Sequence, residues 1–241
     1  MSRVLVVGIG GLGCPAALAL ARAGVGTIGI ADDDEVDLSN LHRQILFSDA
    51  DVGQPKVAAA VRVLTTRFPD VKLEAHATRL LPGNAVDLVS RYDVIVEGSD
   101  NFATKFLTAD ACRLAERPVV HAAAVRWHGT ALAVGPRGGP CYRCVFEDVP
   151  LENPPNCAEA GVIGPMVGVV AAAQADLALS VLSAAESGAE PFGELFTFDG
   201  KTLEHRRRKA ARRRNCPLCG DAKLIRDIEA KRYVEGVTCR A

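Results

Sequence analysis

The motif GIGGLG at Gly8–Gly13 restricts the possible folds of this chain more than any other segment. It follows the short β-rich run Arg3–Gly8 and precedes Gly11–Ala23, in which apolar residues recur at helical spacing. Between a strand and a helix, G-x-G-x-x-G allows a tight turn and lets the backbone approach a phosphate-bearing ligand. The start of the helix adds amide donors and the positive end of the helix dipole. The motif predicts a nucleotide-binding unit, and a glycine-rich turn used only for packing is the alternative.

Strands and helical patterns continue to alternate up to about residue 135. The predicted strands are Arg3–Gly8, Thr27–Ala31, Val71–His76, Val94–Glu97, Val119–Ala124 and Thr130–Val134. Pro55 is suited to the first position of a helix that extends to Arg67. Strands that alternate with helices imply right-handed crossovers and a mostly parallel sheet. We predict an α/β fold with a doubly wound, Rossmann-like sheet.

The pattern changes in the last hundred residues. Cys141–Asn156 is rich in proline, cysteine and acidic residues and predicts a loop. Gly161–Ala185 is rich in small residues and predicts a helix or a pair of helices. Because Pro165, Gln174 and Asp176 interrupt its apolar run, we expect a buried helix rather than a membrane span.

A hairpin is predicted near the C-terminus. After a short linker at Ser187–Pro191, the runs Leu195–Asp199 and Leu203–Arg208 read as two strands. Asp199 and Gly200 are the turn signal between them. We therefore expect a C-terminal antiparallel hairpin that extends the parallel sheet.

Composition indicates a globular protein. Hydrophobic residues make up 49% of the chain, and 28 Lys and Arg balance 29 Asp and Glu, which argues against a dedicated nucleic-acid binder. The N-terminus lacks the pattern of a signal peptide, so we expect a cytoplasmic protein whose eight cysteines serve metal binding or catalysis. We expect one domain over residues 1–241. Its nucleotide-binding half is 1–140, and its second half, 141–241, carries two cysteine pairs, a crossover loop, the helix and the hairpin.

Charged residues after the predicted strands favour a particular nucleotide. Asp32 ends the second strand, where a carboxylate can accept ribose hydroxyls, but this does not distinguish NAD from ATP. Arg43 and Lys56 suit the greater charge of a free triphosphate. Asp100 follows the strand Val94–Glu97 at the carboxyl edge of the sheet, where it could hold Mg²⁺. The candidate nucleotide-binding residues are Gly8, Gly10, Gly11, Gly13, Asp32, Asp34, Asn40, Arg43, Gln44, Lys56 and Asp100.

These residues and the cysteines lie in segments that cover nearly the whole chain in a fixed order. The segments are GIGGLG, DDDEVDLSNLHRQ, GQPK, GSDNFATK, HAAAVRWHG, CYRC, NCAEAGVIGP and NCPLCG. In them the chain resembles the ThiF/MoeB/HesA superfamily, the ubiquitin-activating-type adenylyltransferases for ubiquitin-like sulfur-carrier proteins. The form SNLxRQ resembles the sulfur-carrier branch; related threonylcarbamoyladenosine-tRNA dehydratases more often have asparagine in place of Leu41.

The resemblance implies an activity and roles for single residues. Asp32 would hold the ribose, and Gly10 and Gly11 the nucleotide. Asp100 would coordinate the Mg²⁺ that activates ATP for attack by the C-terminal glycine carboxylate of the carrier, which gives an acyl-adenylate and pyrophosphate. The residues implied to line the triphosphate are Asn40, Arg43, Gln44 and Lys56. The candidate catalytic residues are Arg43, Lys56, Asp100 and Cys157.

The resemblance also implies partners. The substrate would be a small ubiquitin-like sulfur-carrier protein that ends in Gly-Gly, prepared for thiocarboxylate formation. We expect a homodimer through the sheet domain and a sulfur donor such as a cysteine desulfurase or a rhodanese, with no membrane or nucleic-acid partner. Whether the pathway makes thiamine, molybdopterin, cysteine or another product stays open.

The cysteines fall into three groups. Two C-x-x-C pairs suit one tetrahedral structural Zn²⁺, with two unrelated redox dithiols as the alternative. The four predicted zinc ligands are Cys141, Cys144, Cys216 and Cys219. Cys157 precedes a predicted helix, whose N-terminus would favour its thiolate. A cysteine here in family members is assigned to a covalent link with the carrier or its sulfur, and the alternative is a spare loop cysteine. Cys14 and Cys112 are expected in the core, and Cys239 lies in the tail.

Two questions stay open at this point. The basic runs Arg206–Lys209 and Arg212–Arg214 read as a solvated strand edge, a docking surface for an acidic carrier, or an RNA-binding segment. The function could also be that of an NAD(P)-dependent oxidoreductase, although Asn40, Arg43 and Lys56 would then have no evident role. A non-catalytic binding or scaffold protein that retains the fold is the third reading.

Overall fold

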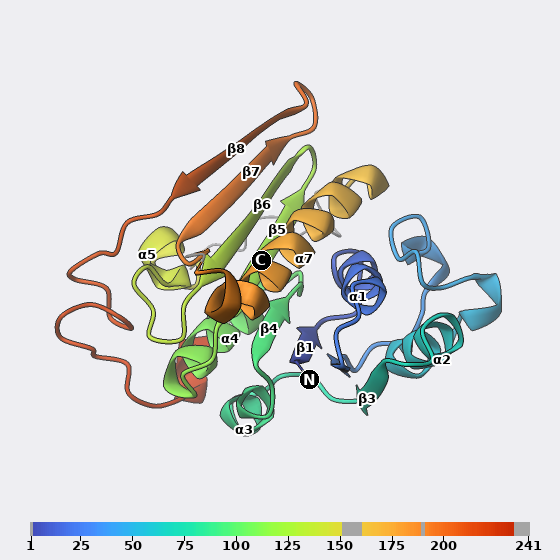
Figure 1. The fold of residues 1–241 in the computed structure, drawn as a ribbon, viewed down its shortest axis with the longest axis horizontal. Coiled ribbons are helices and arrows are strands. Elements are labelled where there is room, and N and C mark those ends of the chain that lie inside the picture. Colours follow the sequence, from blue (N-terminus) through green and yellow to red (C-terminus); the bar gives the residue numbers. More distant parts are fainter. Residues whose placement is uncertain (1, 151–160, 189–190, 234–241) are drawn as a thin grey trace, which may run out of the picture.

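The computed structural model describes residues 2–150, 161–188 and 191–233. Within these ranges, eight strands form one sheet in the order β3-β2-β1-β4-β5-β6-β7-β8 (Figure 1). The strands are β1 (Arg3–Val7), β2 (Thr27–Ala31), β3 (Lys72–His76), β4 (Val94–Glu97), β5 (Val119–Val125), β6 (His128–Val134), β7 (Glu194–Asp199) and β8 (Glu204–Lys209). The strands β1 to β5 are parallel to one another, and β6, β7 and β8 extend the sheet from β5 in antiparallel order. The predicted α/β class with a C-terminal antiparallel hairpin is confirmed.

Helices cover both faces of the sheet. The helices are α1 (Gly13–Arg22), α2 (Lys56–Arg67), α3 (Ala85–Ser90), α4 (Phe102–Leu114), α5 (Tyr142–Phe146) and α7 (Gly164–Ser187), with short 3-10 helices η1 (Leu38–Asn40), η2 (Asp49–Asp51) and η3 (Ala230–Tyr233). Side chains of α1, α2 and α7 form one buried cluster with one face of the sheet. Side chains of α3, α4 and α5 form the other, which includes the four clustered cysteines.

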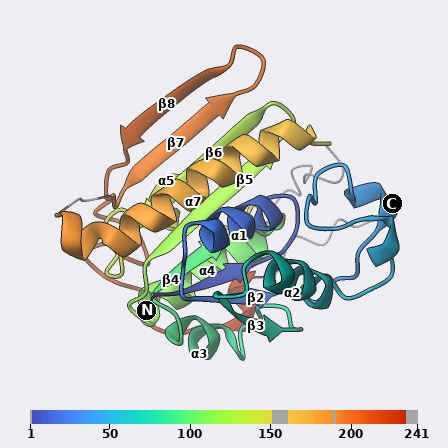
Figure 2. The ribbon, with the colours of Figure 1, turned by 45° about the vertical axis from the view of Figure 1, so that its right-hand side comes forward.

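The long apolar segment is one helix, α7, where the sequence left a pair of helices open. Residues 164–184 have the length and hydropathy of a membrane span, and 56% of that window is buried inside the fold. Figure 2 shows α7 lying along β5 and β6, and it also contacts α1. Its fully buried Gln174 donates to the carbonyls of Glu97 (2.7 Å) and Val120 (2.8 Å). These contacts are those of the buried helix predicted from the sequence.

Several predicted boundaries differ from the structure. The predicted loop Cys141–Asn156 contains the helix α5, because Cys141 and Cys144 must turn toward the same point; residues 151–156 lie outside the described part. Pro55 directly precedes α2 instead of being its first residue. Ser187 ends α7, so it is not in the linker. In the hairpin, residues 200–203 form the connection, and Asp199 Oδ1 accepts a bond from the Lys201 amide (2.8 Å) at its start.

The strand order determines where a ligand can bind. From β1 the chain builds outward through β2 to β3, then returns to the other side of β1 and builds outward through β4 to β5. Connections on the two sides of β1 and β4 therefore diverge, and such a switch point leaves a crevice at the carboxyl ends of these strands. The glycine-rich loop follows β1, and Asp100 follows β4. The fold brings these two segments together at the crevice.

Candidate functional site

The four positions of the glycine-rich loop serve two purposes. Gly8 has φ of +83°, and a Cβ there would lie 3.2 Å from the Ser99 amide nitrogen. A Cβ on Gly13 would lie 1.9 Å from the Gly8 carbonyl oxygen. A Cβ on Gly10 would lie 3.8 Å from Gln44 Nε2, one on Gly11 would lie 3.3 Å from Arg43 Cγ and Cδ, and both glycines line the cavity. Gly13 thus closes the turn, while Gly10 and Gly11 leave room for a ligand.

A cavity of about 410 Å³ occupies the crevice. The sequence-predicted residues that line it are Gly8, Gly10, Gly11, Asp32, Asp34, Asn40, Arg43, Gln44, Lys56 and Asp100. They come from the ends of β1, β2 and β4, from η1 and the turn after it, and from the start of α2. Gly13 does not border the cavity, and Cys157 lies outside the described residues.

Asp32 holds the glycine-rich loop against the acidic loop after β2. Its two carboxylate oxygens accept hydrogen bonds from the backbone amides of Ile9 (2.8 Å) and Asp34 (2.8 Å). Burial raises the pKa of Asp32, and the two amide bonds and the nearby Lys56 ammonium oppose that rise. A carboxylate has about four acceptor positions, so two remain for the hydroxyls of a ribose.

Both predicted cations, Arg43 and Lys56, border the cavity. The nearly buried Lys56 ammonium lies 2.8 Å from Asp34 Oδ2, and Arg43 Nη2 donates to Asn40 Oδ1 at 2.6 Å. Gln44 is buried, and its Oε1 has no hydrogen-bond partner within the described part of the chain. A row of donors on a held arginine, a lysine and an amide fits a polyanion that carries several phosphates.

Asp100 provides a carboxylate, a type of ligand that Mg²⁺ prefers. It is exposed, borders the cavity, and has no hydrogen-bond or ion-pair partner among residues 2–150, 161–188 and 191–233. Carboxylate oxygens next to substrate phosphates are the usual protein contribution to a magnesium site. The residues present therefore fit a Mg²⁺–ATP complex, in which Asp100 would hold the metal.

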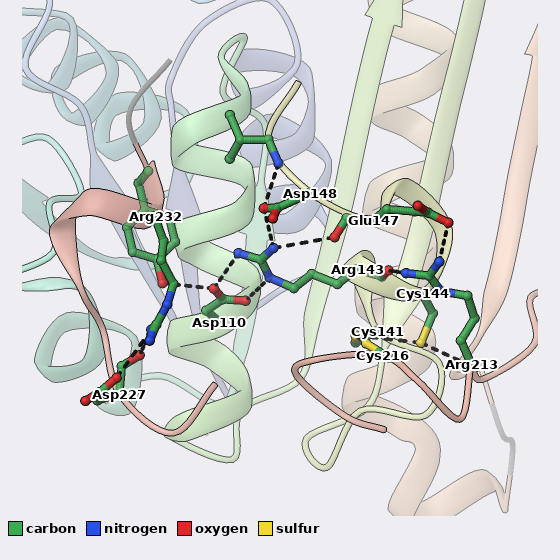
Figure 3. Close-up of polar contacts among 12 residues, drawn as sticks. Asp110, Cys141, Arg143, Cys144, Glu147, Asp148, Arg213, Cys216, Asp227 and Arg232 are labelled. Carbon is green, nitrogen blue, oxygen red and sulfur yellow. Dashed lines mark hydrogen bonds and ion pairs between the residues drawn. The ribbon is translucent and has the colours of Figure 1, made fainter. Parts of the chain in front are cut away.

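The four predicted zinc ligands come together in one buried cluster, of which Figure 3 shows Cys141, Cys144 and Cys216. The Sγ atoms of Cys141 and Cys216 are 3.5 Å apart, those of Cys144 and Cys219 are 3.3 Å apart, and those of Cys141 and Cys144 are 3.9 Å apart. Zn–S bonds of about 2.3 Å place tetrahedral thiolates about 3.8 Å apart. The cluster fits a closed, structural Zn²⁺ site, and two separate dithiols would have no reason to converge.

A buried arginine attaches this cluster to the helix layer. Arg143, between the first two cysteines, donates to Asp110 of α4 from Nε (2.8 Å) and Nη2 (2.9 Å) and to Asp148 from Nη1 (2.7 Å) (Figure 3). Tyr233 donates to the same Asp110 carboxylate at 2.9 Å. Arg213 donates to the carbonyl of Arg143 (2.8 Å) and its amide approaches Cys144 Sγ (3.4 Å). Part of the basic run is thus structural.

Comparison with known proteins decides the family. The sequence profile of the ThiF family matches residues 1–218. The chain belongs to the ThiF family.

Relatives of this ThiF-family chain have related names. It is 44% identical over 231 residues to the "Adenylyltransferase and sulfurtransferase MOCS3" of Bos taurus, covering 95% of this chain and 50% of that protein. It is 44% identical over 222 residues to the "Sulfur carrier protein ThiS adenylyltransferase" of Escherichia coli, covering 91% of this chain and 86% of that protein. The chain spans about half the length of the MOCS3 relatives.

Solved structures support the fold. The crystal structure of E. coli MccB with MccA-N7isoASN matches with a TM-score of 0.80 at 22% identity, covering 91% of this chain and 67% of that one. The ATP-bound crystal structure of MccB gives a TM-score of 0.77. At this identity the likeness concerns the architecture alone.

The cavity-lining residues of the ThiF-family chain that were not predicted from its sequence include Arg79, Lys105 and Tyr142. Arg79 follows β3 and pairs with Asp33 (3.3 Å). Lys105 belongs to the segment GSDNFATK, in which only Asp100 was interpreted, and Tyr142 lies between two zinc ligands. The sequence thus contained the motifs of Lys105 and Tyr142, but only the tertiary structure shows that these residues line the same cavity as Arg79.

The two core cysteines are buried, as expected. Burial raises the pKa of Cys14 to about 12, and burial also raises the pKa of Cys112. Both thiols are therefore protonated at neutral pH and unsuited to nucleophilic chemistry.

The cysteine cluster predicts one Zn²⁺ per chain. Cys216→Ser should reduce the zinc content to near zero, because three thiolates no longer close the tetrahedron. A loss of about 3 kcal/mol would lower the midpoint of thermal unfolding by roughly 6–12 °C in a chain of this size. Metal analysis and calorimetry measure both effects. Cys112→Ala, which removes a buried thiol outside the cluster, should keep its zinc; equal zinc contents in the two variants would contradict the assignment.

Proposed function

We propose that this chain adenylates the C-terminal glycine of a small ubiquitin-like sulfur-carrier protein and releases pyrophosphate. The observation that carries the proposal is the convergence of Arg43, Lys56 and Asp100 on one cavity beside Asp32. This set suits a magnesium triphosphate, whereas the bridging diphosphate of NAD(P) needs mainly backbone amides. The names of the MOCS3 and ThiS adenylyltransferase relatives support the same reaction.

The chemistry requires charge placement rather than a covalent catalyst. The carrier carboxylate attacks the α-phosphorus of ATP; an O–P bond forms, the bond between the α-phosphorus and the bridging oxygen breaks, and pyrophosphate leaves. Mg²⁺, when bound, neutralises the phosphate charge. Arg43 and Lys56 stabilise the leaving group, and Asp32 fixes the ribose so that the reacting atoms stay in line. The Lys56 ammonium has three donors, so it can bind phosphate while it keeps its contact with Asp34.

The carrier would reach this cavity along the face of β6, β7 and β8 that lies opposite α7, called the open face here. Ala123 of β5 lines the cavity and pairs with Thr130 of β6; Thr130 pairs with Thr197 of β7, and Thr197 with Arg206 of β8. Paired residues on neighbouring antiparallel strands share a face. This row therefore runs from the basic edge strand to the cavity over three strand spacings, or about 14 Å. Arg208 lies on the same face as Arg206, opposite Leu195.

On the other face of β8, Arg207 is already paired with carboxylates. Arg207 lies within 3.0 Å of Asp176 on α7 and also pairs with Glu194. On the open face, Arg206 and Arg208 are exposed, and within the described part of the chain the carboxylate paired with Arg206 is that of the exposed Glu204, at 3.3 Å. We infer that an acidic carrier docks on this face. Of the three alternatives for the basic run, this inference favours the docking surface. The homodimer, the sulfur donor, a covalent role for Cys157 and the cytoplasmic location stay predictions, and the carrier's pathway stays open.

The first test of the function is exchange of pyrophosphate into ATP in the presence of ThiS-type carriers that end in Gly-Gly. The wild-type protein should catalyse Mg²⁺-dependent exchange, and Asp100→Ala should reduce its rate by about 10²–10³ because the metal-held leaving group is lost. Asp87→Ala, which removes an exposed carboxylate of α3 outside the cavity, is the matched control and should keep the rate. Exchange that is unchanged in Asp100→Ala, or a carrier lacking its last glycine that supports full exchange, would refute the proposal.

The second test concerns the docking face. Exchanging both Arg206 and Arg208 for Glu should raise the KM for the carrier by about tenfold at low ionic strength, and less at high salt, with little change in kcat. Arg207→Gln removes a cation from the opposite face and should leave the KM within about twofold. If the Arg207 variant is the one that weakens the carrier interaction, the carrier does not dock on the open face.

A further inference from the structure

A fully buried carboxylate lies directly beneath the candidate site. Glu97, the last residue of β4, has no exposed side-chain surface and four donors around its two oxygens. Its Oε1 accepts the amide (2.7 Å) and the hydroxyl of Ser99. Its Oε2 lies 2.9 Å from the ammonium of Lys105 and 3.2 Å from Nδ1 of His121. Glu97 pairs with His121 in register across β4 and β5, so both side chains are on the same face.

Fold stability alone is a weak explanation for this charge. The rest of β4 is Val94, Ile95 and Val96, all buried, and a fourth apolar residue would complete that strand without desolvation of two ions. The Lys105 ammonium and the hydrogen bonds from His121 and Ser99 outweigh burial and lower the pKa of Glu97 to about 2, so the carboxylate is charged at neutral pH. The buried charge of Glu97 at the end of β4 therefore indicates a role that an apolar side chain could not fulfil.

The segment held by this carboxylate carries the metal ligand. Ser99, bound twice to Glu97, directly precedes Asp100. On the far side, Asn101 caps α4 through a bond from the Thr104 amide to its Oδ1 (2.8 Å). Asp100 makes no side-chain bond of its own within the described ranges, so its position depends on these two anchored neighbours.

The same cluster also fixes the strand beside the cavity. Lys105 borders the cavity and donates to the Ala122 carbonyl of β5 at 2.6 Å. From the opposite face of the sheet, Gln174 links the carbonyls of Glu97 and Val120. Tyr142, one residue after a zinc ligand, packs on His121 with ring centroids 4.4 Å apart. The β4–α4 turn and β5 are thus held to each other around Glu97.

We propose that Glu97 is a positioning residue: through Ser99 it holds Asp100 where the metal of the bound nucleotide requires it. The proposal rests on the proposed function, because that function gives Asp100 its metal. It assigns a role to the buried cluster that neither the sequence motifs nor the names of the relatives contain. Glu97 itself touches neither nucleotide nor carrier.

The test measures metal binding without turnover. Mn²⁺ is titrated by electron paramagnetic resonance into the full chain with the non-hydrolysable ATP analogue AMPCPP and no carrier. Glu97→Gln, which keeps the shape of the side chain but removes its charge, should weaken Mn²⁺ binding by about tenfold, while metal-free AMPCPP binding changes by less than about twofold. Amide exchange of the peptide that contains Ser99 and Asp100 should become faster in the same variant.

A second buried carboxylate on the same side of the sheet provides the matched control. Asp110 is fully buried and ion-paired to Arg143 but does not border the cavity. Asp110→Asn should lower the thermal midpoint and leave the Mn²⁺ affinity unchanged. If Glu97→Gln does not fold, Ser99→Ala removes one of the two bonds to Glu97 and should weaken Mn²⁺ binding by about threefold.

The outcomes separate this proposal from the proposed function. Unchanged Mn²⁺ affinity in the folded Glu97 variant, or in Ser99→Ala where that variant replaces it, would overturn the positioning role. Equal losses of affinity in the Glu97 and Asp110 variants would do the same, since they would reflect stability alone. A wild-type protein that binds AMPCPP without any gain from Mn²⁺ would contradict the metal role of Asp100, and so the proposed function. Normal metal binding without pyrophosphate exchange would contradict only the carrier reaction.

Discussion

The parallel pairing of β1 with β4 is the constraint on which the rest of the structure depends. Because β1 lies between β2 and β4, the connections that leave the two central strands run in opposite directions and open a crevice at their carboxyl ends. The glycine-rich loop and the Asp100 turn meet there at backbone distance: a Cβ on Gly8 would lie 3.2 Å from the Ser99 amide. The residues proposed to bind the nucleotide and the metal therefore meet because of the sheet topology, not because of their positions in the sequence.

The C-terminal part of the chain provides the proposed docking surface for the carrier beside this crevice. The strands β6 to β8 extend the sheet in antiparallel order, and their open face leads from exposed arginines to the cavity wall at Ala123. The four-cysteine cluster joins the start and end of this part and attaches it to α4 through Arg143 and Asp110. Under the proposed function, the crevice would bind the nucleotide and this face would receive the macromolecular substrate.

The sequence predicted those features that depend on local patterns. Strand–helix alternation predicted the fold class, the glycine motif predicted the turn after β1, and the paired C-x-x-C motifs predicted the cysteine cluster. Glu97, His121 and Gln174 could not be predicted as a unit, because their contacts depend on the register of β4 with β5 and on which face α7 covers. Gln174 appeared only as an interruption of an apolar run, although that interruption marks the residue that bonds two strands. The loop prediction at α5 failed for the same reason, since convergence of distant cysteines shapes that segment.

The most direct measurement of the central claim is the intact mass of the carrier after incubation with this chain, Mg²⁺ and ATP, with no sulfur donor and no nucleophile present. The account predicts that a carrier ending in Gly-Gly gains the mass of one adenylyl group, and that the gain requires ATP, Mg²⁺ and the terminal glycine. Adenylylation that is independent of the terminal glycine would place the reaction elsewhere on the carrier. No adduct with any such carrier, combined with tight binding of NAD(H) and none of ATP, would contradict the account and favour an oxidoreductase.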